Sequence, residues 1–256
     1  MPRALRIVQR NAMVFRRIWR GSVFVTFLQP ALYLTAMGIG VGSMVDRGGA
    51  ALPGGVPYIV FLAPGLMAAT CMQSAGFESS FPIAGKMTWQ RNYDAIAGAP
   101  MRVVDIVTGE LAWVALRLLV IASAFLAVLT VFGAARSPRI LAAVPAAVLT
   151  GLAFSAPTMA YAATLSKGQN FNALFRFVLT PLFLFSGVFF PVTRLPLLLQ
   201  RVAVLTPLFH GVELTRGLAL DTLTWPAAAT HLVYLAVVVA AGTAASVYTF
   251  TRRLYA

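Results

Sequence analysis

The chain has 256 residues, of which 59% are hydrophobic and only 11% are charged, and its mean hydropathy is +0.83. Soluble domains carry about 25% charged residues, so this composition excludes a soluble domain and indicates an integral membrane protein. The net charge of +13 does not indicate nucleic-acid binding, because the arginines cluster between apolar runs instead of forming one basic face.

Residues 1–20 place apolar side chains at helical spacing on one face, with most arginines off that face. This pattern predicts an amphipathic helix lying at the membrane interface. The alternative is that these arginines only fix the topology, and both interpretations put the N-terminus in the cytosol.

Six apolar runs follow, so we expect an all-α polytopic membrane protein with one transmembrane domain over residues 1–256. The predicted spans are 23–45, 56–77, 106–132, 140–165, 172–190 and 225–250. The fifth run is short and reaches bilayer length only if its helix begins near Phe171. Six spans place both termini on one side, which carries thirteen lysines and arginines against six on the other. The positive-inside rule therefore predicts cytosolic termini in a bacterial cytoplasmic (inner) membrane.

The loop at residues 78–105 is the only substantial polar insertion on the cytosolic side. It mixes aromatic anchors with charges, as interface cores do, and its candidate contact residues are Lys86, Met87, Trp89, Arg91, Tyr93 and Asp94. We therefore predict that this loop docks a partner protein. The alternative is a solvated connection that only sets the topology.

Two ionisable residues, Glu110 and Arg117, lie inside the third span, seven residues apart on one helix face. A charge at membrane depth must face protein or water. Either the two residues pair with groups on neighbouring helices, or they form a polar wall of a substrate path.

Residues 191–224 are too apolar for an open loop and too often broken by proline for a span. We predict an outward-facing re-entrant helical element whose notable residues are Pro191, Arg194, Pro196, Pro207, His210, Glu213 and Arg216. His210 and Glu213 lack a third ligand, since the other histidine lies in the sixth span, so no metal site is expected. A hydrogen-bond role at a turn fits better, with Arg216 as the partner of Glu213.

No GxxxxGK[ST] motif occurs, so the chain is not expected to bind ATP through a P-loop, and no catalytic or cofactor-binding residue is predicted. Two motif blocks resemble ABC-2-type transporter permeases, most similarly the nodulation-factor (lipooligosaccharide) and daunorubicin exporter group. The first block contains Phe61–Gly65 and Trp89–Arg91. The second contains Ser186–Pro191, Leu195-Pro196, Pro207–His210 and Arg216-Gly217.

The resemblance implies a homodimeric permease that pairs with two copies of an ATP-binding-cassette ATPase subunit, where ATP and Mg²⁺ are bound. It implies a coupling helix at about Gly85–Ala99, an outer element that steers release, and outward transport of an amphipathic substrate. Lipooligosaccharides, glycolipids, polysaccharides and hydrophobic drugs all remain open as cargo. Further candidates for the substrate path are Phe185, Phe189 and Phe190, which suit acyl chains or sugar faces.

Two other functions are alternatives to transport driven by a separate ATPase. A membrane-embedded enzyme acting on lipid-linked substrates would need convergent carboxylates or histidines, and the outer side offers few. An ion-coupled secondary transporter would need acidic residues near mid-membrane and inverted repeats, which the sequence lacks.

Overall fold

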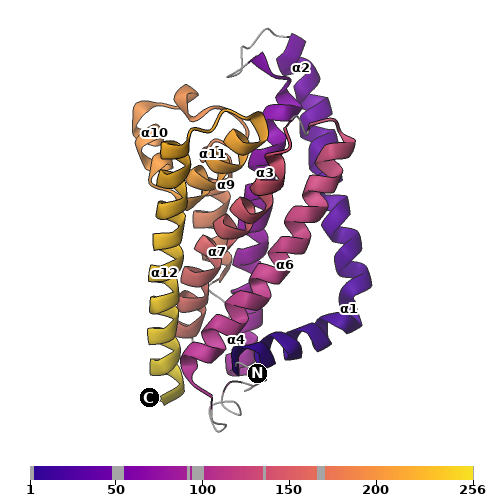
Figure 1. Cartoon of the computed structure of the whole chain (residues 1–256). Helices are drawn as coiled ribbons and strands as arrows, with labels where there is room; N and C mark the ends of the chain where they lie inside the picture. The colour runs from indigo at the N-terminus through magenta and orange to yellow at the C-terminus, as the bar shows by residue number, and fades with distance from the viewer. Residues whose placement is uncertain are drawn as a thin grey trace.

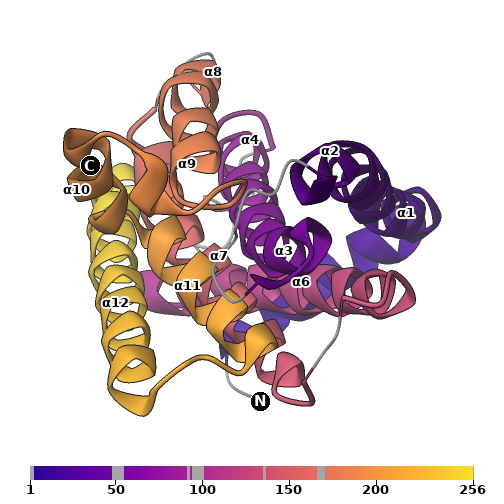
Figure 2. The same ribbon diagram turned by 90° about the horizontal axis from the view of Figure 1, so that it is seen from above.

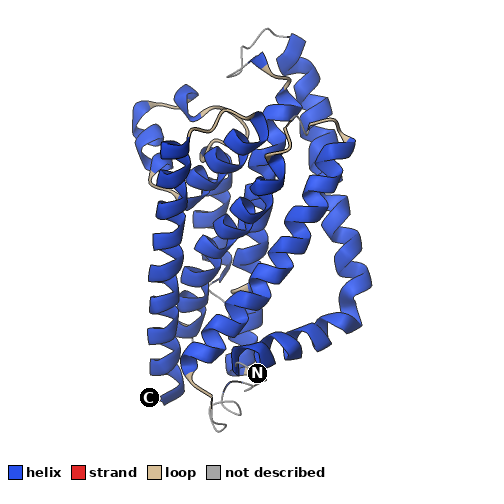
Figure 3. Cartoon of the chain, in the orientation of Figure 1, coloured by secondary structure: helices blue, strands red, loops and turns tan. Residues whose placement is uncertain are grey.

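The computed structural model describes residues 3–47, 55–90, 93, 101–134, 137–165 and 171–255. In these residues all regular secondary structure is helical, as Figure 3 shows, so the predicted all-α class is confirmed. Within this described part, five helical segments are long and apolar enough to cross a membrane, or six if one bent pair counts as a single span. Both termini lie at the same end of the bundle (Figure 1), and we call it the terminal end.

The predicted interfacial helix and first span form one continuous helix, α1 (Arg3–Tyr33), instead of two separate elements. Its first part lies across the terminal end of the bundle and its second part turns along it (Figure 1). A π-helical stretch, η1 (Leu34–Val41), and the short α2 (Gly42–Arg47) extend the apolar part, which is long enough to span from Thr26 to Arg47.

Helix α3 (Tyr58–Glu78) lies at the centre of the bundle and packs against α6 (Val103–Val131), α7 (Ile140–Thr164) and α11 (Pro207–Leu220) (Figure 2). Helix α12 (Trp225–Tyr255) packs mainly on α7. A glycine permits the close approach of three central helices. A Cβ at Gly151 would lie 2.5 Å from a Leu118 methyl carbon and 3.0 Å from the Cys71 carbonyl oxygen.

The fifth predicted span is shorter than expected. Its helix consists of α8 (Phe171–Leu174), the π-helical η4 (Phe175–Leu179) and α9 (Thr180–Phe185), so it ends five residues before the predicted limit at residue 190. Fifteen residues of helix cover only about 22 Å, less than the roughly 30 Å of a bilayer core. The helix ends because the chain turns at Gly187, which has a positive φ of 83°.

The predicted outer element is present as two helices, α10 (Leu197–Val204) and α11, which are bent by 83° relative to each other. A short 3-10 turn, η5 (Val192–Arg194), precedes them. Prolines set these breaks: Pro196 immediately precedes α10, and Pro207 is the first residue of α11. The pair lies at the end of the bundle opposite the termini (Figure 1).

Candidate functional site

The terminal end of the bundle holds a buried polar cluster around Glu110 of α6, which we call the Glu110 cluster. Lys86 Nζ lies 2.7 Å from both carboxylate oxygens of Glu110. The Asn11 amide and the Tyr93 hydroxyl each donate to the same carboxylate at 2.9 Å. Only 1% of the Glu110 side chain is exposed. A buried carboxylate with this many donors is satisfied within the protein.

The Glu110 cluster joins segments that are far apart in sequence. Asn11 lies on α1, and Lys86 lies on α4 (Phe81–Thr88), the short helix that follows α3. Lys86 also donates to the Asn11 side-chain oxygen at 3.3 Å. Burial, followed by the charge of Glu110, raises the pKa of Tyr93 well above its ordinary value, so this hydroxyl stays protonated as a donor. The cluster therefore fastens α1 and α4 to the third span.

The residues expected to contact a partner do not form one surface. Trp89 exposes 80% of its surface directly after α4, whereas Met87 and Tyr93 are buried and Lys86 points into the Glu110 cluster. These three side chains hold the loop against the bundle, because burial in the cluster and among apolar neighbours makes them structural. In the described part of this loop a short helix lies at Phe81–Thr88, while most of the range expected for the coupling helix, including Arg91 and Asp94, lies outside the described residues.

Arg117 has partners of its own, distinct from those of Glu110. It forms an ion pair with Glu78 at the end of α3, with an N–O distance of 2.9 Å and about one fifth of each side chain exposed. Its guanidinium also lies 4.4 Å from the centre of the Phe15 ring on α1. Both ionisable residues of the third span therefore pair with neighbouring helices, as the structural alternative predicted.

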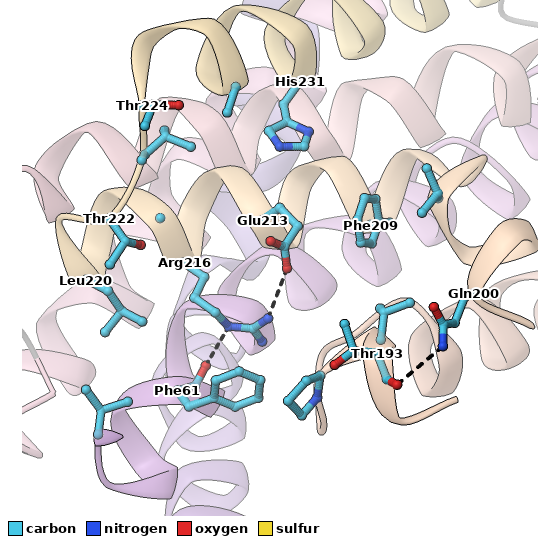
Figure 4. Close-up of a pocket in the computed structure, with 17 residues that line it drawn as sticks. Phe61, Thr193, Gln200, Phe209, Glu213, Arg216, Leu220, Thr222, Thr224 and His231 are labelled. Carbon is cyan, nitrogen blue, oxygen red and sulfur yellow. Dashed lines mark hydrogen bonds and ion pairs between the residues drawn. The ribbon is translucent and has the colours of Figure 1, made fainter. Parts of the chain in front are cut away.

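A cavity of about 640 Å³ opens at the end of the bundle opposite the termini, between α3, the bent pair and α12 (Figure 4). Its lining includes Phe61 and Pro191, together with polar side chains from η5, α10, α11, the connection after α11, and α12: Thr193, Gln200, Glu213, Arg216, Thr222, Thr224 and His231. The cavity is amphipathic, since apolar side chains from the same helices complete its wall. The three phenylalanines of the predicted path, Phe185, Phe189 and Phe190, do not line this cavity. Phe185 is 41% exposed, and Phe189 packs edge-on against Phe183.

Arg216 connects three of the segments around this cavity. Its guanidinium donates to the carbonyl oxygens of Phe61, Gly187 and Val188 at 3.0, 2.8 and 3.2 Å, and it stacks 3.8 Å from the Phe61 ring centre. The expected contact with Glu213 is present at 3.4 Å. The carbonyl contacts could not be found from the sequence, because no motif marks a backbone acceptor.

His210 joins the bend to the last span. Its Nδ1 lies 2.8 Å from Nδ1 of His231, its Nε2 lies 3.0 Å from the Val204 carbonyl oxygen, and its ring stacks on Tyr234 at 3.8 Å. Sequence reasoning had set His231 aside as a residue of the sixth span. Its pairing with His210 is a long-range contact that helix periodicity cannot reveal. His210 therefore makes hydrogen-bond contacts at the bend between α10 and α11.

The described residues form a bundle of membrane-length apolar helices, with a buried ion pair at one end and a bent helix pair beside an amphipathic cavity at the other, and this architecture defines a multi-pass membrane protein. The ABC-2 type transporter family matches residues 4–220, and the chain belongs to this family. It is thus a multi-pass transmembrane permease subunit of an ATP-binding-cassette exporter.

The chain is similar to several proteins that carry the name Nodulation protein J. It is 35% identical to that of Sinorhizobium fredii over 83% of this chain and 79% of the relative. The protein from Rhizobium leguminosarum bv. trifolii is 34% identical over 83% and 79%, respectively. The protein from Bradyrhizobium diazoefficiens is 32% identical over 96% of this chain and 92% of the relative.

Proposed function

We propose that two copies of this chain form the permease of an exporter that carries a lipooligosaccharide or related glycolipid outward across the cytoplasmic membrane. Two copies of a separate ATP-binding-cassette subunit bind ATP and Mg²⁺ and dock on the cytosolic face. The excess of lysine and arginine on the side of the termini supports a cytosolic orientation for the terminal end. The relatives' common name, Nodulation protein J, favours a secreted nodulation signal as cargo.

The observation that carries this proposal is the position of Trp89. Trp89 follows α4, and the ion pair between Lys86 and Glu110 connects α4 to α6. A displacement of the exposed indole is therefore transmitted to α6 through this ion pair. Exposed aromatic anchors are the residues that most often dominate protein interfaces. An ATPase that moves when it binds and hydrolyses ATP can therefore act on the spans through α4.

The cavity at the opposite end supports the assignment of α10 and α11 to cargo release. In the proposed orientation it faces outward, and it combines apolar walls with hydroxyl and amide groups suited to sugars. Arg216 holds α11 against the irregular segment around Gly187, so a movement of α11 would change the shape of the cavity.

Two tryptophans provide a matched test. Trp89→Ala removes the proposed anchor, and Trp225→Ala removes a residue that is 89% exposed at the start of α12, at the opposite end of the bundle. Truncation of an interface anchor typically costs about 2 kcal/mol or more, so Trp89→Ala should weaken co-purification of the ATPase by roughly thirtyfold. Trp225→Ala should leave it unchanged. Equal retention of the ATPase by both variants would refute the docking site.

A further inference from the structure

Two adjoining cavities lie near the terminal end, away from the outer cavity, between α1, α3 and α6. The first is apolar, has a volume of about 500 Å³, and is lined by Phe15, Trp19, Trp113, Leu116 and Val120 among others. The second has a volume of about 470 Å³. The two share Thr26, Arg117 and Ile121 as lining residues, so they adjoin, and we call the two together the recess.

The second cavity has a polar wall made by side chains from three helices: Gln29, Thr70, Gln73, Ser74, Glu78 and Arg117. Gln29 lies in the apolar part of α1, and Gln73 lies on the central α3. Neither amide makes a hydrogen bond within the described part of the chain. An amide in a membrane-embedded wall is costly without a hydrogen-bond partner, so these groups are available to a polar ligand.

The charges of the recess indicate what kind of headgroup it accepts. Of the charged residues that line the recess, Arg16 lies at the apolar cavity, and Arg117 is paired with Glu78 at 2.9 Å, so the polar wall itself carries a donor and an acceptor whose charges cancel. Such a wall favours a neutral group with many hydroxyls over a phosphate, which would compete with Glu78 for the guanidinium. The amides of Gln29 and Gln73 donate and accept in the same way that sugar hydroxyls do.

The apolar part suits an acyl chain. Phe15 and Trp113 meet edge-on with their ring centres 5.9 Å apart, and the Arg117 guanidinium covers the Phe15 ring at the border with the polar part. Leu116 and Val120 are 48% and 55% exposed on the outer surface of α6, so this side opens toward the membrane. Gln73 lies only five residues before Glu78, about 8 Å along the helix axis, so the recess sits near the terminal end.

We propose that this recess is a binding site for a glycolipid, which holds the neutral sugar headgroup on the Gln29–Gln73 wall and one acyl chain along Phe15, Trp113 and Leu116. A lipid in the leaflet at the terminal end reaches it sideways, between α1 and α6. The inference deepens the proposed function, on which it rests for the identity of the leaflet. It assigns the site of cargo uptake to a position distinct from the outer cavity.

The test uses the purified full-length permease alone, in detergent, titrated with dioleoyl monoglucosyl diacylglycerol or dioleoyl phosphatidylglycerol and followed by native mass spectrometry. The wild type should prefer the glucosyl lipid. Loss of two hydrogen-bonding amides in Gln29→Leu/Gln73→Leu should weaken glucosyl lipid binding about tenfold or more and leave phosphatidylglycerol unchanged.

Two tryptophan substitutions on α6 test the acyl-chain groove. Leu116→Trp fills it and should weaken binding of the glucosyl lipid, whereas Leu119→Trp, at a lipid-exposed position that lines neither cavity, should not. Retained phosphatidylglycerol binding shows that a variant is folded.

Three results would overturn the site. The first is that Gln29→Leu/Gln73→Leu binds the glucosyl lipid as tightly as the wild type does, and the second is that the wild type binds both lipids equally. The third is that Leu116→Trp still binds the glucosyl lipid but no longer forms a dimer, which would assign the groove to a second copy of the chain. Because no ATPase or transport is involved, a failed export assay would contradict the proposed function and leave this measurement standing.

Discussion

Replacement of Glu110 by leucine should destabilise the protein by leaving a buried positive charge without its partner. The Lys86 side chain is only 14% exposed, so its ammonium group cannot regain full hydration after the carboxylate is removed. Removal of one partner from a buried ion pair costs about 3–5 kcal/mol. Asn11 and Tyr93 also lose their acceptor, which places Glu110→Leu near the upper end of this range.

The double variant Lys86→Met/Glu110→Leu separates the stranded charge from the lost contacts. It removes the charge and leaves the cost of the two lost hydrogen bonds from Asn11 and Tyr93, about 1 kcal/mol each. The double variant should therefore be more stable than Glu110→Leu alone. As a control, Asp221→Asn breaks the exposed pair with Arg139 and should cost under about 1 kcal/mol, since asparagine also tolerates the left-handed backbone at this position.

Stability would be measured by denaturant unfolding in detergent micelles, with hydrogen exchange of the α4 segment as a local probe. The order of stability should be wild type, then Asp221→Asn, then the double variant, and last Glu110→Leu, with exchange in α4 rising most in the last. If Glu110→Leu is as stable as the control, or if the double variant is less stable than Glu110→Leu, the Glu110 cluster does not fasten α4 to α6 and the reasoning is refuted.

Three further predictions concern topology and the outer end. A cysteine at Gln90 in a Cys71→Ala background should react with membrane-impermeant thiol reagents only after permeabilisation, and reaction in intact cells would contradict the cytosolic assignment. A cysteine at Leu198 should be shielded by lipid while one at Arg194 reacts from outside, and free labelling at Leu198 would contradict the re-entrant placement of α10. Arg216→Met should lower the free energy of unfolding by about 3 kcal/mol or more, because three backbone carbonyls lose their donor. A protease should then cleave the segment around residue 187 more readily than in the wild type. Unchanged resistance to protease would contradict the bracing role.

The transmembrane helices follow from the sequence because a membrane forces backbone hydrogen bonds into continuous helices. The fourth span, predicted at 140–165, is observed at Ile140–Thr164. The bend between α10 and α11 was equally predictable, since Pro207 cannot continue a helix. The early end of the fifth span was missed, because it depends on the positive φ of Gly187, which glycine permits but does not require.

For the sites, the sequence identifies the ionisable residues within the spans but not the side chains that contact them. An ionisable residue at membrane depth indicates a polar environment, and this logic found Glu110 and Arg117. Their partners were not predictable, because Asn11 lies 99 residues from Glu110 in the chain and tertiary packing alone brings them together. For the same reason Lys86 was expected at a docking surface although it is turned inward, and the two cavities beside Arg117 had no signal in the sequence.

The central claim is that this chain exports a glycolipid when a separate ATPase acts on it through the α4 helix. The direct test places the permease and its ATPase in inverted vesicles with a fluorescent lipooligosaccharide in the outer, cytosol-equivalent leaflet. ATP should drive the label into the lumen, where a membrane-impermeant reductant cannot quench it. Trp89→Ala should abolish most of this protection, and Trp225→Ala should not. Protection that is independent of ATP, or equal in the wild type and Trp89→Ala, would contradict the account.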